Sequence, residues 1–357
     1  LRADADPAAL AASFERAGAA AVSILVDQRF GGSVDDLRAA RAATDLPLLA
    51  KGFFHSADEL RTMRAAGADA VLLIMDELDD ISAVRLLAAA ESMGLETLVE
   101  VHDGAELDRA LPMNAGIIGV NSRDLRTFQV DRKAQLVLVS QVPHDRVVVA
   151  ESGIETRAHA AAAELAGADA ILVGSTLMRA TAPAKKLARL LARPLVKVCG
   201  LTREEDVAAA VAAGVDMVGF VLAPSPRRIP RPLPVSDGTL SVAVFVGQTG
   251  DVDTDLIQLY DEEDGHRARD GEVRWQGRPV ARVVDLPWME DDAEHWRRAA
   301  SVPGRIMLAG GLGPDNVHAA VAAVKPWCVD ATRSLEKRPG VKDHARIRAF
   351  VEAARCL

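Results

Sequence analysis

The sequence has few aromatic residues and few cysteines. Aromatic side chains make up 4% of its 357 residues, with a single tyrosine. Since 49% of the residues are hydrophobic, Ala, Val and Leu must fill most of the interior, and they suffice for one large or two medium cores. The cysteines Cys199, Cys328 and Cys356 are odd in number and far apart, so they indicate neither a disulfide framework nor a metal site. We therefore expect a globular protein of the reducing cytoplasm.

The sequence also lacks a surplus of positive charge and a long apolar run. A formal charge of -9 argues against nucleic acid or an anionic membrane as partner, whereas a small anion needs only main-chain amides and a few cations. No apolar run approaches the about 20 residues of a membrane span, and the first residues lack a signal pattern. The chain opens at Leu1 instead of Met, so we expect that its true beginning precedes this residue.

What the sequence does have is a regular alternation of β-branched runs with amphipathic stretches rich in Ala and Leu. Strict βα alternation predicts a parallel sheet. In the first half the predicted strands are residues 21–27, 46–53, 70–76, 96–102, 116–121, 147–152 and 170–174. A closed barrel of this kind needs eight strands, and the opening helical segment 7–18 should itself follow a strand. The missing strand is expected to be the first.

The alternation restarts after Pro194. The predicted strands are residues 195–199, 217–222, 242–246, 256–260, 279–285, 306–310 and 327–331. Residues 262–277 are too polar and too interrupted by glycine to predict a helix. The fold class is therefore α/β, with two tandem (β/α)8 TIM barrels over residues 1–192 and 193–357. The first should lack its first strand, and the second should be shortened in the middle.

Polar clusters stand where the apolar runs end, which is where such barrels keep their chemistry. In the first half these clusters also resemble the indole-3-glycerol-phosphate synthase family in order and approximate spacing. The matching motifs are Phe30-Gly31-Gly32-Ser33, Lys51-Gly52-Phe53, Leu98-Val99-Glu100-Val101-His102, Ile118-Gly119-Val120-Asn121-Ser122-Arg123-Asp124-Leu125, Glu151-Ser152-Gly153-Ile154 and Leu172-Val173-Gly174-Ser175.

The resemblance implies a ring closure that protonates a carbonyl and expels carbon dioxide and water, so an acid and a base are needed. It implies Lys51 as general acid and Glu100 as base. Asn121 and Glu151 would orient substrate hydroxyls or water. The implied binding residues are Phe53 for the aryl ring, Arg123 for the departing carboxylate, and Ser152, Gly153, Gly174 and Ser175 for phosphate.

Structural readings of the same residues stay open. A single lysine at a strand end is usually a solvated rim residue, and Glu100 and Glu151 can be partners in structural ion pairs. Gly174 can be a turn glycine. His102 follows Glu100, and we expect it to point to the opposite side of the strand, where it packs or caps.

The second half resembles phosphoribosylanthranilate isomerase. The matching motifs are Val196-Lys197-Val198-Cys199-Gly200-Leu201-Thr202, Gly219-Phe220-Val221, Ser225-Pro226-Arg227, Gln258-Leu259, Leu308-Ala309-Gly310-Gly311-Leu312 and Pro339-Gly340-Val341-Lys342-Asp343. The resemblance implies an Amadori rearrangement with Cys199 as base. It assigns anthranilate binding to Arg227, and a phosphate cradle to Gly310, Gly311, Arg333 and Ser334.

Two points in the second half stay open. Cys199 can be merely a small buried apolar residue. The acid should be an aspartate that ends the sixth strand. Asp285 ends an apolar run and is the candidate, but its distance from Gln258 fits the fifth strand better, and in that case the acid is absent from this sequence. Tyr260 stands where the family usually has histidine.

Together the two resemblances imply a bifunctional enzyme of tryptophan biosynthesis, a lyase and an isomerase, without metal or organic cofactor. Its partners would be small phosphorylated anthranilate sugars, with no nucleic acid and no membrane, and the chain would be a monomer with two packed barrels. The alternatives are a chain in which only one barrel is catalytically competent, and a non-catalytic phosphate-sugar binding protein.

Overall fold

A computed structural model describes residues 5–123, 129–263, 266–286 and 293–355. The chain divides into two compact units. The first consists of two segments, the chain up to Glu155 and Ala160–Leu191. The second consists of Thr156–His159 and the chain from Ala192 onward.

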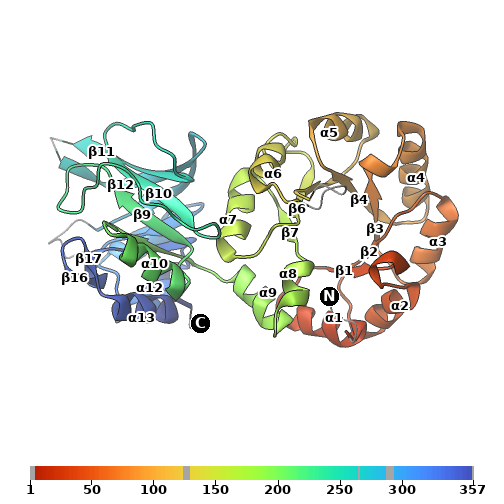
Figure 1. The fold of residues 1–357 in the computed structure, drawn as a ribbon, viewed down its shortest axis with the longest axis horizontal. Helices are drawn as coiled ribbons and strands as arrows, with labels where there is room; N and C mark the ends of the chain where they lie inside the picture. The colour runs from red at the N-terminus through yellow and green to blue at the C-terminus, as the bar shows by residue number, and fades with distance from the viewer. Residues whose placement is uncertain (1–4, 124–128, 264–265, 287–292, 356–357) are drawn as a thin grey trace. The chain divides into compact units, whose positions relative to one another are not determined.

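The first unit is a parallel sheet whose strands follow one another in sequence order (Figure 1). Among the described residues, β1 and β7 form its two edges, and the seven strands are those predicted for this part of the sequence. The strands are β1 (Val22–Leu25), β2 (Leu48–Lys51), β3 (Ala70–Ile74), β4 (Glu96–Val101), β5 (Ile117–Asn121), β6 (Val147–Glu151) and β7 (Ala170–Leu172).

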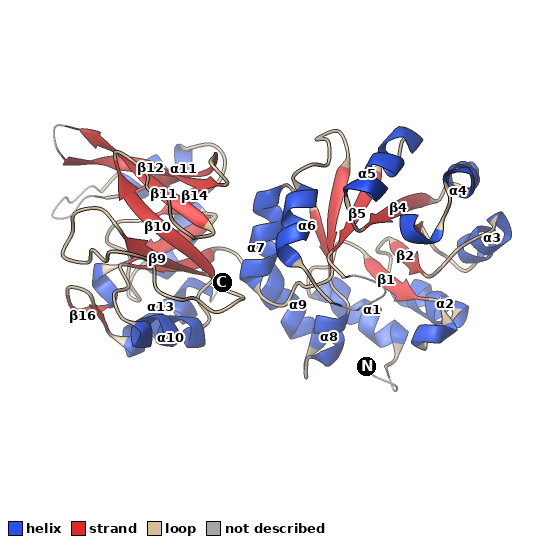
Figure 2. Ribbon diagram, turned by 45° about the horizontal axis from the view of Figure 1, so that its top comes forward, coloured by secondary structure: helices blue, strands red, loops and turns tan. Residues whose placement is uncertain are grey.

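Helices alternate with these strands and lie around the outside of the curved sheet (Figure 2). Their starts are fixed by side-chain caps: Ser56 and Glu59 form a capping box at α3, and Ser33 caps α2. The helices are α1 (Pro7–Arg16), α2 (Val34–Ala43), α3 (Ala57–Ala65), α4 (Asp80–Ser92), α5 (Gly104–Ala110), α6 (Arg132–Val139), α7 (Arg157–Ala166), α8 (Ser175–Arg179) and α9 (Pro183–Leu191), with short 3-10 turns at Gln28–Phe30, Met75–Glu77 and Leu111–Met113.

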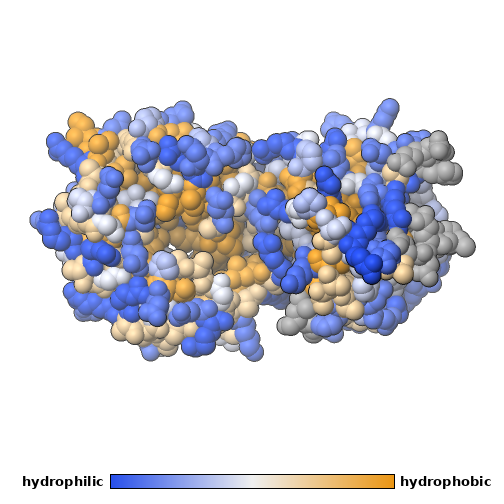
Figure 3. Space-filling view, turned by 180° about the vertical axis from the view of Figure 1, so that it is seen from behind, coloured by the Kyte–Doolittle hydropathy of each residue, from blue (hydrophilic) through white to orange (hydrophobic). Residues whose placement is uncertain are grey.

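The strands of the first unit are mostly apolar, and Glu100 and Glu151 lie near the carboxyl ends of β4 and β6. Leu72, Ile74 and Leu98 form a cluster, against which Phe53 packs. On the face shown in Figure 3, apolar side chains gather in the middle of this unit and hydrophilic ones at its rim. No helix in the described ranges is long and apolar enough to cross a membrane.

The second unit is a closed barrel with the strand order β8, β9, β10, β11, β12, β13, β14, β15. These strands are β8 (Leu195–Cys199), β9 (Met217–Val221), β10 (Leu240–Val246), β11 (Leu256–Glu263), β12 (His266–Trp275), β13 (Arg278–Val284), β14 (Ile306–Leu308) and β15 (Cys328–Ala331). The other elements are α10 (Glu204–Ala213), α11 (His295–Ser301), α12 (Val317–Val324), the 3-10 turn Arg333–Leu335, the hairpin β16 (Glu336–Arg338) and β17 (Val341–Lys342), and α13 (His344–Arg355).

The second barrel is shortened in its middle as predicted, because no helix among the described residues lies between β9 and β13, but the unpredicted strand β12 still closes it with eight strands. This strand pairs antiparallel with both β11 and β13. A tight turn at Gln276 and Gly277, both with positive φ, reverses the chain between β12 and β13. That turn is a sequence signal for a hairpin, and Val273 and Trp275 alternate inward beside it. Because residues 262–277 contain many polar side chains, the sequence analysis did not predict this strand.

The core of the second unit holds the strand ends in place. Val198, Phe220 and Leu308 from three strands are fully buried and join Phe350 of α13 in one apolar cluster. Since the parallel strands all end at one rim, residues just after β8, β11, β13, β14 and β15 meet there.

Candidate active sites

Lys51 lies between two buried carboxylates in the first unit. Its Nζ is 2.9 Å from Glu100 Oε2 and 3.0 Å from Glu151 Oε2. Lys51 and Glu151 are the last residues of β2 and β6, and Glu100 is the last but one of β4. The side chains of both glutamates are 1% exposed, whereas that of Lys51 is 25% exposed. The structure therefore brings together three predicted catalytic residues at the rim of the sheet.

Asn121, at the end of β5, completes this group. Its Nδ2 donates a hydrogen bond of 3.0 Å to Glu100 Oε1. His102 also joins it: Nε2 lies 3.3 Å from Glu100 Oε1 and Nδ1 lies 3.0 Å from Glu106 Oε2. The expectation that His102 points away from Glu100 is wrong, because residues two apart in an extended segment face the same side.

The environment moves the pKa values of these groups in different directions. Burial disfavours the charge on Lys51, but the charges of Glu151 and Glu100 outweigh burial and raise the pKa of the ammonium group. Burial opposes ionisation of Glu100 too, yet the hydrogen bond with His102 and the charge of Lys51 lower its pKa. For Glu151, burial and the charge of Glu100 raise the pKa to about 7. Two carboxyl groups held in different protonation states suit acid–base chemistry near neutrality.

His102 carries a charge in this arrangement. Although burial disfavours its protonated form, the contacts with the carboxylates of Glu100 and Glu106 raise its pKa to about 10. A cationic imidazole beside Glu100 helps to keep that carboxylate ionised.

Glycine at position 119 makes room for Glu151. A Cβ atom at Gly119 would lie 2.2 Å from Glu151 Oε1, so any larger residue at this position would displace the carboxylate. Gly219 has the same relationship to the second site, because a Cβ atom there would lie 2.6 Å from Cys199 Sγ.

The predicted aryl-binding residue Phe53 lies in an aromatic group. Its ring stacks on Phe30 with 6.0 Å between the centroids, and the guanidinium of Arg29 lies 4.2 Å from the Phe53 centroid. The sequence analysis assigned no role in the site to Phe30. The Phe30-Gly31-Gly32-Ser33 motif was the available signal.

The remaining predicted residues of the first unit follow the strands as expected. Arg123 lies just beyond β5, and its main-chain N–H donates to Asn121 Oδ1. Ser152 and Gly153 follow β6 with φ of 62° and 67°, the left-handed region that a serine rarely adopts. Gly174 and Ser175 lie at the start of α8, and a Cβ atom on Gly174 would meet open space.

A chain of hydrogen bonds runs through the interior of the second barrel. Lys197 Nζ donates bonds of 2.8 Å to both Asp330 Oδ2 and Gln258 Oε1. Gln258 Nε2 in turn donates to the hydroxyl of Tyr260, which donates 2.9 Å to Asp285 Oδ2. Sequence reasoning did not include Lys197 or Asp330 in the site. Isolated polar residues inside the otherwise apolar strands 195–199 and 328–331 were the signal.

Cys199 ends β8 next to this network and is 5% exposed. Burial raises the pKa of its thiol, although the nearby charge of Lys197 works in the opposite direction. In the free protein Cys199 is thus a thiol, and it has to lose a proton before it can act as a base.

Asp285 lies just after β13, and the strand order decides its place around the barrel. Because β12 fills the fifth place, β13 is sixth and pairs with β14, the seventh. Asp285 is 9% exposed and stands where the acid was expected. The spacing from Gln258 had favoured the fifth strand because it did not account for β12.

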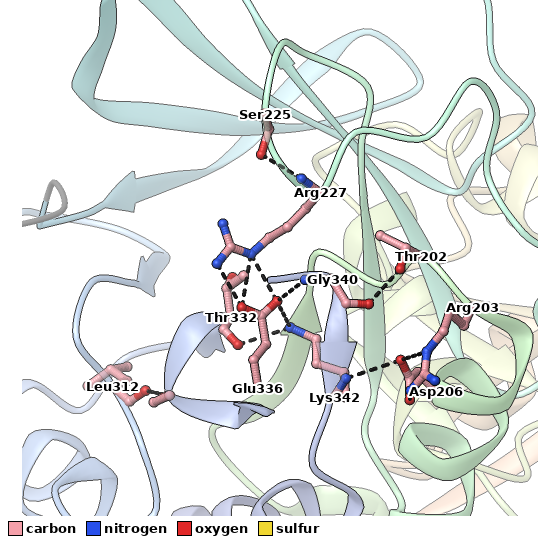
Figure 4. Close-up of polar contacts among 11 residues, drawn as sticks. Thr202, Arg203, Asp206, Ser225, Arg227, Leu312, Thr332, Glu336, Gly340 and Lys342 are labelled. Carbon is pink, nitrogen blue, oxygen red and sulfur yellow. Dashed lines mark hydrogen bonds and ion pairs between the residues drawn. The ribbon is translucent and has the colours of Figure 1, made fainter. Parts of the chain in front are cut away.

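Arg227 is held by an acidic partner in the free protein (Figure 4). Its Nε and Nη2 lie 2.9 and 2.7 Å from the two carboxylate oxygens of Glu336. Lys342 Nζ donates to the same carboxylate at 3.1 Å and to the carbonyl of Thr332 at 2.9 Å. Two cations on one carboxylate leave the cluster with a net positive charge.

The predicted phosphate cradle is brought together from β14 and β15. Gly310 and Gly311 have φ of 86° and 68° after β14. The Ser334 hydroxyl donates to the carbonyl of Leu312, which joins the two loops. Burial and the charge of Arg227 lower the pKa of Arg333.

The fold and the sites define an α/β-barrel enzyme with acid and base groups at its strand ends. The sequence matches the family profile "Indole-3-glycerol phosphate synthase" over residues 1–190. It is 46% identical over 183 residues to the synthase of Micrococcus luteus, which covers 51% of this chain and 68% of that protein. It is 47% identical over 188 residues to the synthase of a Parafrankia species, covering 52% and 70%. The chain belongs to the indole-3-glycerol phosphate synthase family.

A second profile, "N-(5'phosphoribosyl)anthranilate (PRA) isomerase", matches residues 292–353. Among solved structures, TrpF from Jonesia denitrificans is 28% identical with a TM-score of 0.37, over 46% of this chain and 97% of that one. A phosphoribosyl anthranilate isomerase in complex with a reduced deoxyribulose phosphate is 25% identical with a TM-score of 0.34, over 46% and 100%. The chain thus matches the synthase family over residues 1–190 and the isomerase family over residues 292–353, which is consistent with a bifunctional enzyme of tryptophan biosynthesis.

Proposed function

We propose that the second unit converts N-(5-phosphoribosyl)anthranilate into carboxyphenylamino-deoxyribulose phosphate, and that the first unit closes this product to indole-3-glycerol phosphate. The small-molecule substrates are then phosphorylated anthranilate sugars, and neither step uses a metal or an organic cofactor. The observation that carries the proposal is the contact of Lys51 with both Glu100 and Glu151 at the strand ends.

In the first unit, Lys51 acts as the general acid. The raised pKa keeps its ammonium group protonated, so it can donate a proton to the substrate carbonyl. Glu100, whose pKa is lowered, remains ionised and accepts a proton. Glu151 and Asn121 orient the hydroxyl that leaves as water, and Phe53 provides an apolar wall for the aryl ring.

In the second unit, one acid and one base move the proton of the Amadori rearrangement. Asp285 faces Arg267 as a carboxylate. It first takes up a proton from solvent and then donates this proton as the sugar ring opens, and Cys199, once it has lost its own proton to solvent, removes the proton from C2 as a thiolate. The ammonium group of Lys197 stabilises the thiolate that Cys199 must form.

The anionic groups of the substrates are bound by cations and by glycine-rich turns. In the second unit Arg227 binds the anthranilate carboxylate, and the turns around Gly310 and Ser334 hold the phosphate with Arg333. In the first unit Ser152, Gly153, Gly174 and Ser175 hold the phosphate, and Arg123 binds the carboxylate that is lost. We expect the enzyme to act as a monomer in the cytoplasm.

Assaying the two steps separately tests the proposal. The isomerase step is followed by the loss of fluorescence of the anthranilate adduct, and the synthase step by formation of indoleglycerol phosphate from synthetic carboxyphenylamino-deoxyribulose phosphate. Turnover of both substrates supports the proposal. Turnover of only one identifies a chain with one competent barrel, and binding without turnover identifies a phosphate-sugar binding protein.

A further inference from the structure

The antiparallel strand β12 brings its first residues to the active rim of the second barrel. In a barrel of parallel strands, the first residues of each strand lie at the opposite end. Because β12 runs against β11, Arg267 pairs with Glu262, near the carboxyl end of β11. A cation at the beginning of a strand thereby reaches the rim where Asp285 lies.

Arg267 contacts both Asp285 and its hydrogen-bond partner. Its Nη1 lies 2.7 Å from Asp285 Oδ2, and its guanidinium lies 4.2 Å from the centroid of the Tyr260 ring. The Tyr260 hydroxyl donates to the same oxygen, Oδ2, at 2.9 Å. Two donors therefore hold this one oxygen of the carboxylate.

The main chain of Asp285 is held by the same strand. Its N–H donates 3.2 Å to Oδ1 of Asp270, a residue of β12. Arg298 of α11 donates 2.6 Å to Asp270 Oδ2 and 3.3 Å to the carbonyl of Asp285. β12 therefore supports Asp285 at its side chain through Arg267 and at its backbone through Asp270.

The side chain of Arg267 is partly exposed, and its guanidinium stays charged. The side chains of Arg267 and Asp285 are 30% and 12% exposed, so the pair lies where a substrate can reach it. Burial works against the charge of Arg267, but Asp285 outweighs burial and raises the pKa of the guanidinium.

We propose that Arg267 is a positioning residue for Asp285: together with Tyr260 it holds Oδ2, so that Oδ1 is the oxygen that exchanges a proton with the substrate. The inference rests on the proposed isomerase function of the second unit. It assigns to β12 a role beyond closing the barrel, since this strand carries the support for the acid.

The test compares Arg267→Met, Arg267→Lys and Arg274→Ala in the full chain. Arg267→Met keeps an unbranched side chain and removes the guanidinium that lies over the Tyr260 ring. We expect kcat of the isomerase step to fall about 100-fold with KM changed less than about threefold, because misplacing a reacting group costs rate more than binding. Arg267→Lys should recover part of kcat. Arg274, which pairs with Glu272 on the same strand, is the matched control and should leave kcat unchanged.

A double variant separates positioning from a general structural effect. If Arg267 acts through Asp285, Arg267→Met combined with Asp285→Asn should lose no more rate than Asp285→Asn alone. Additive losses, or an Arg267→Met variant as active as Arg274→Ala, would overturn the inference. A wild-type chain without isomerase turnover contradicts the proposed function instead. In that case, crystal structures of the wild type and of Arg267→Met test the inference. A carboxylate of Asp285 in the same position in both structures would refute it.

Discussion

Lys51 Nζ donates a hydrogen bond of 3.0 Å to Glu151 Oε2 across 100 positions of sequence. The contact joins the ends of β2 and β6, which are not neighbours in the sheet. It therefore exists only because the sheet curves far enough for side chains to meet across its inner side. The chemistry of the first unit depends on this curvature as much as on the residue types.

Replacing Lys51 should separate the two activities. Lys51→Ala removes the proposed acid, and the synthase step should slow by about 10²- to 10⁴-fold, whereas the isomerase step should be unaffected. Both rates are measured on the same preparation, with Lys133→Ala, an exposed lysine of α6, as control. Equal loss of both activities in a folded variant would count against separate sites.

Glu151 should make the first unit less stable as the pH rises. Its pKa is raised from 4.5 to about 7, so between these values the folded carboxyl stays protonated while the unfolded one ionises. The stability that this group contributes is complete below about pH 4.5 and is lost as the pH passes 7, by at most about 3 kcal/mol.

Glu151→Gln isolates this effect, because the amide does not titrate. Urea unfolding of both proteins, followed by circular dichroism at pH 5 and pH 7, should show a larger decrease in the free energy of unfolding for the wild type. The single tyrosine and all four tryptophans lie beyond residue 192, so intrinsic fluorescence would not report on the first unit. The same pH dependence in both proteins would refute the raised pKa.

Gly119→Ala tests the space that β5 leaves for Glu151. The added Cβ would lie 2.2 Å from Glu151 Oε1, so the carboxylate must move, and the synthase step should slow by about 100-fold. Gly116→Ala is the matched control, because a Cβ atom there has no neighbour within 4 Å. If Gly119→Ala keeps the full synthase rate, the position of Glu151 does not matter for the reaction.

Cys199→Ala and Asp285→Asn should slow the isomerase step by similar factors. Removing a positioned base or acid typically costs 10²- to 10⁴-fold, whereas a merely packed thiol at Cys199 should change the rate little. The sixth place of β13 in the barrel supports the assignment of Asp285. An intact rate in Cys199→Ala would remove the isomerase assignment and leave the second barrel as a scaffold.

The sequence determined the parts of this protein that depend on local pattern. The alternation of apolar runs and amphipathic stretches predicted the parallel strands of both units, because a strand or helix is selected mainly by the period of its own side chains. The same pattern predicted an absent first strand, since the opening helix had no strand before it. Motifs at the strand ends also predicted Lys51, Glu100, Asn121 and Glu151, which the structure brings together.

Only the tertiary structure decided the features that depend on pairing and burial. Residues 266–275 are polar at many positions, and they form a strand because β11 and β13 offer hydrogen-bonding edges on both sides. That pairing moved Asp285 to the sixth place and brought Arg267 to its carboxylate. The opposite pKa shifts of Glu100 and Glu151 likewise arise from burial beside shared charges, which no sequence spacing encodes.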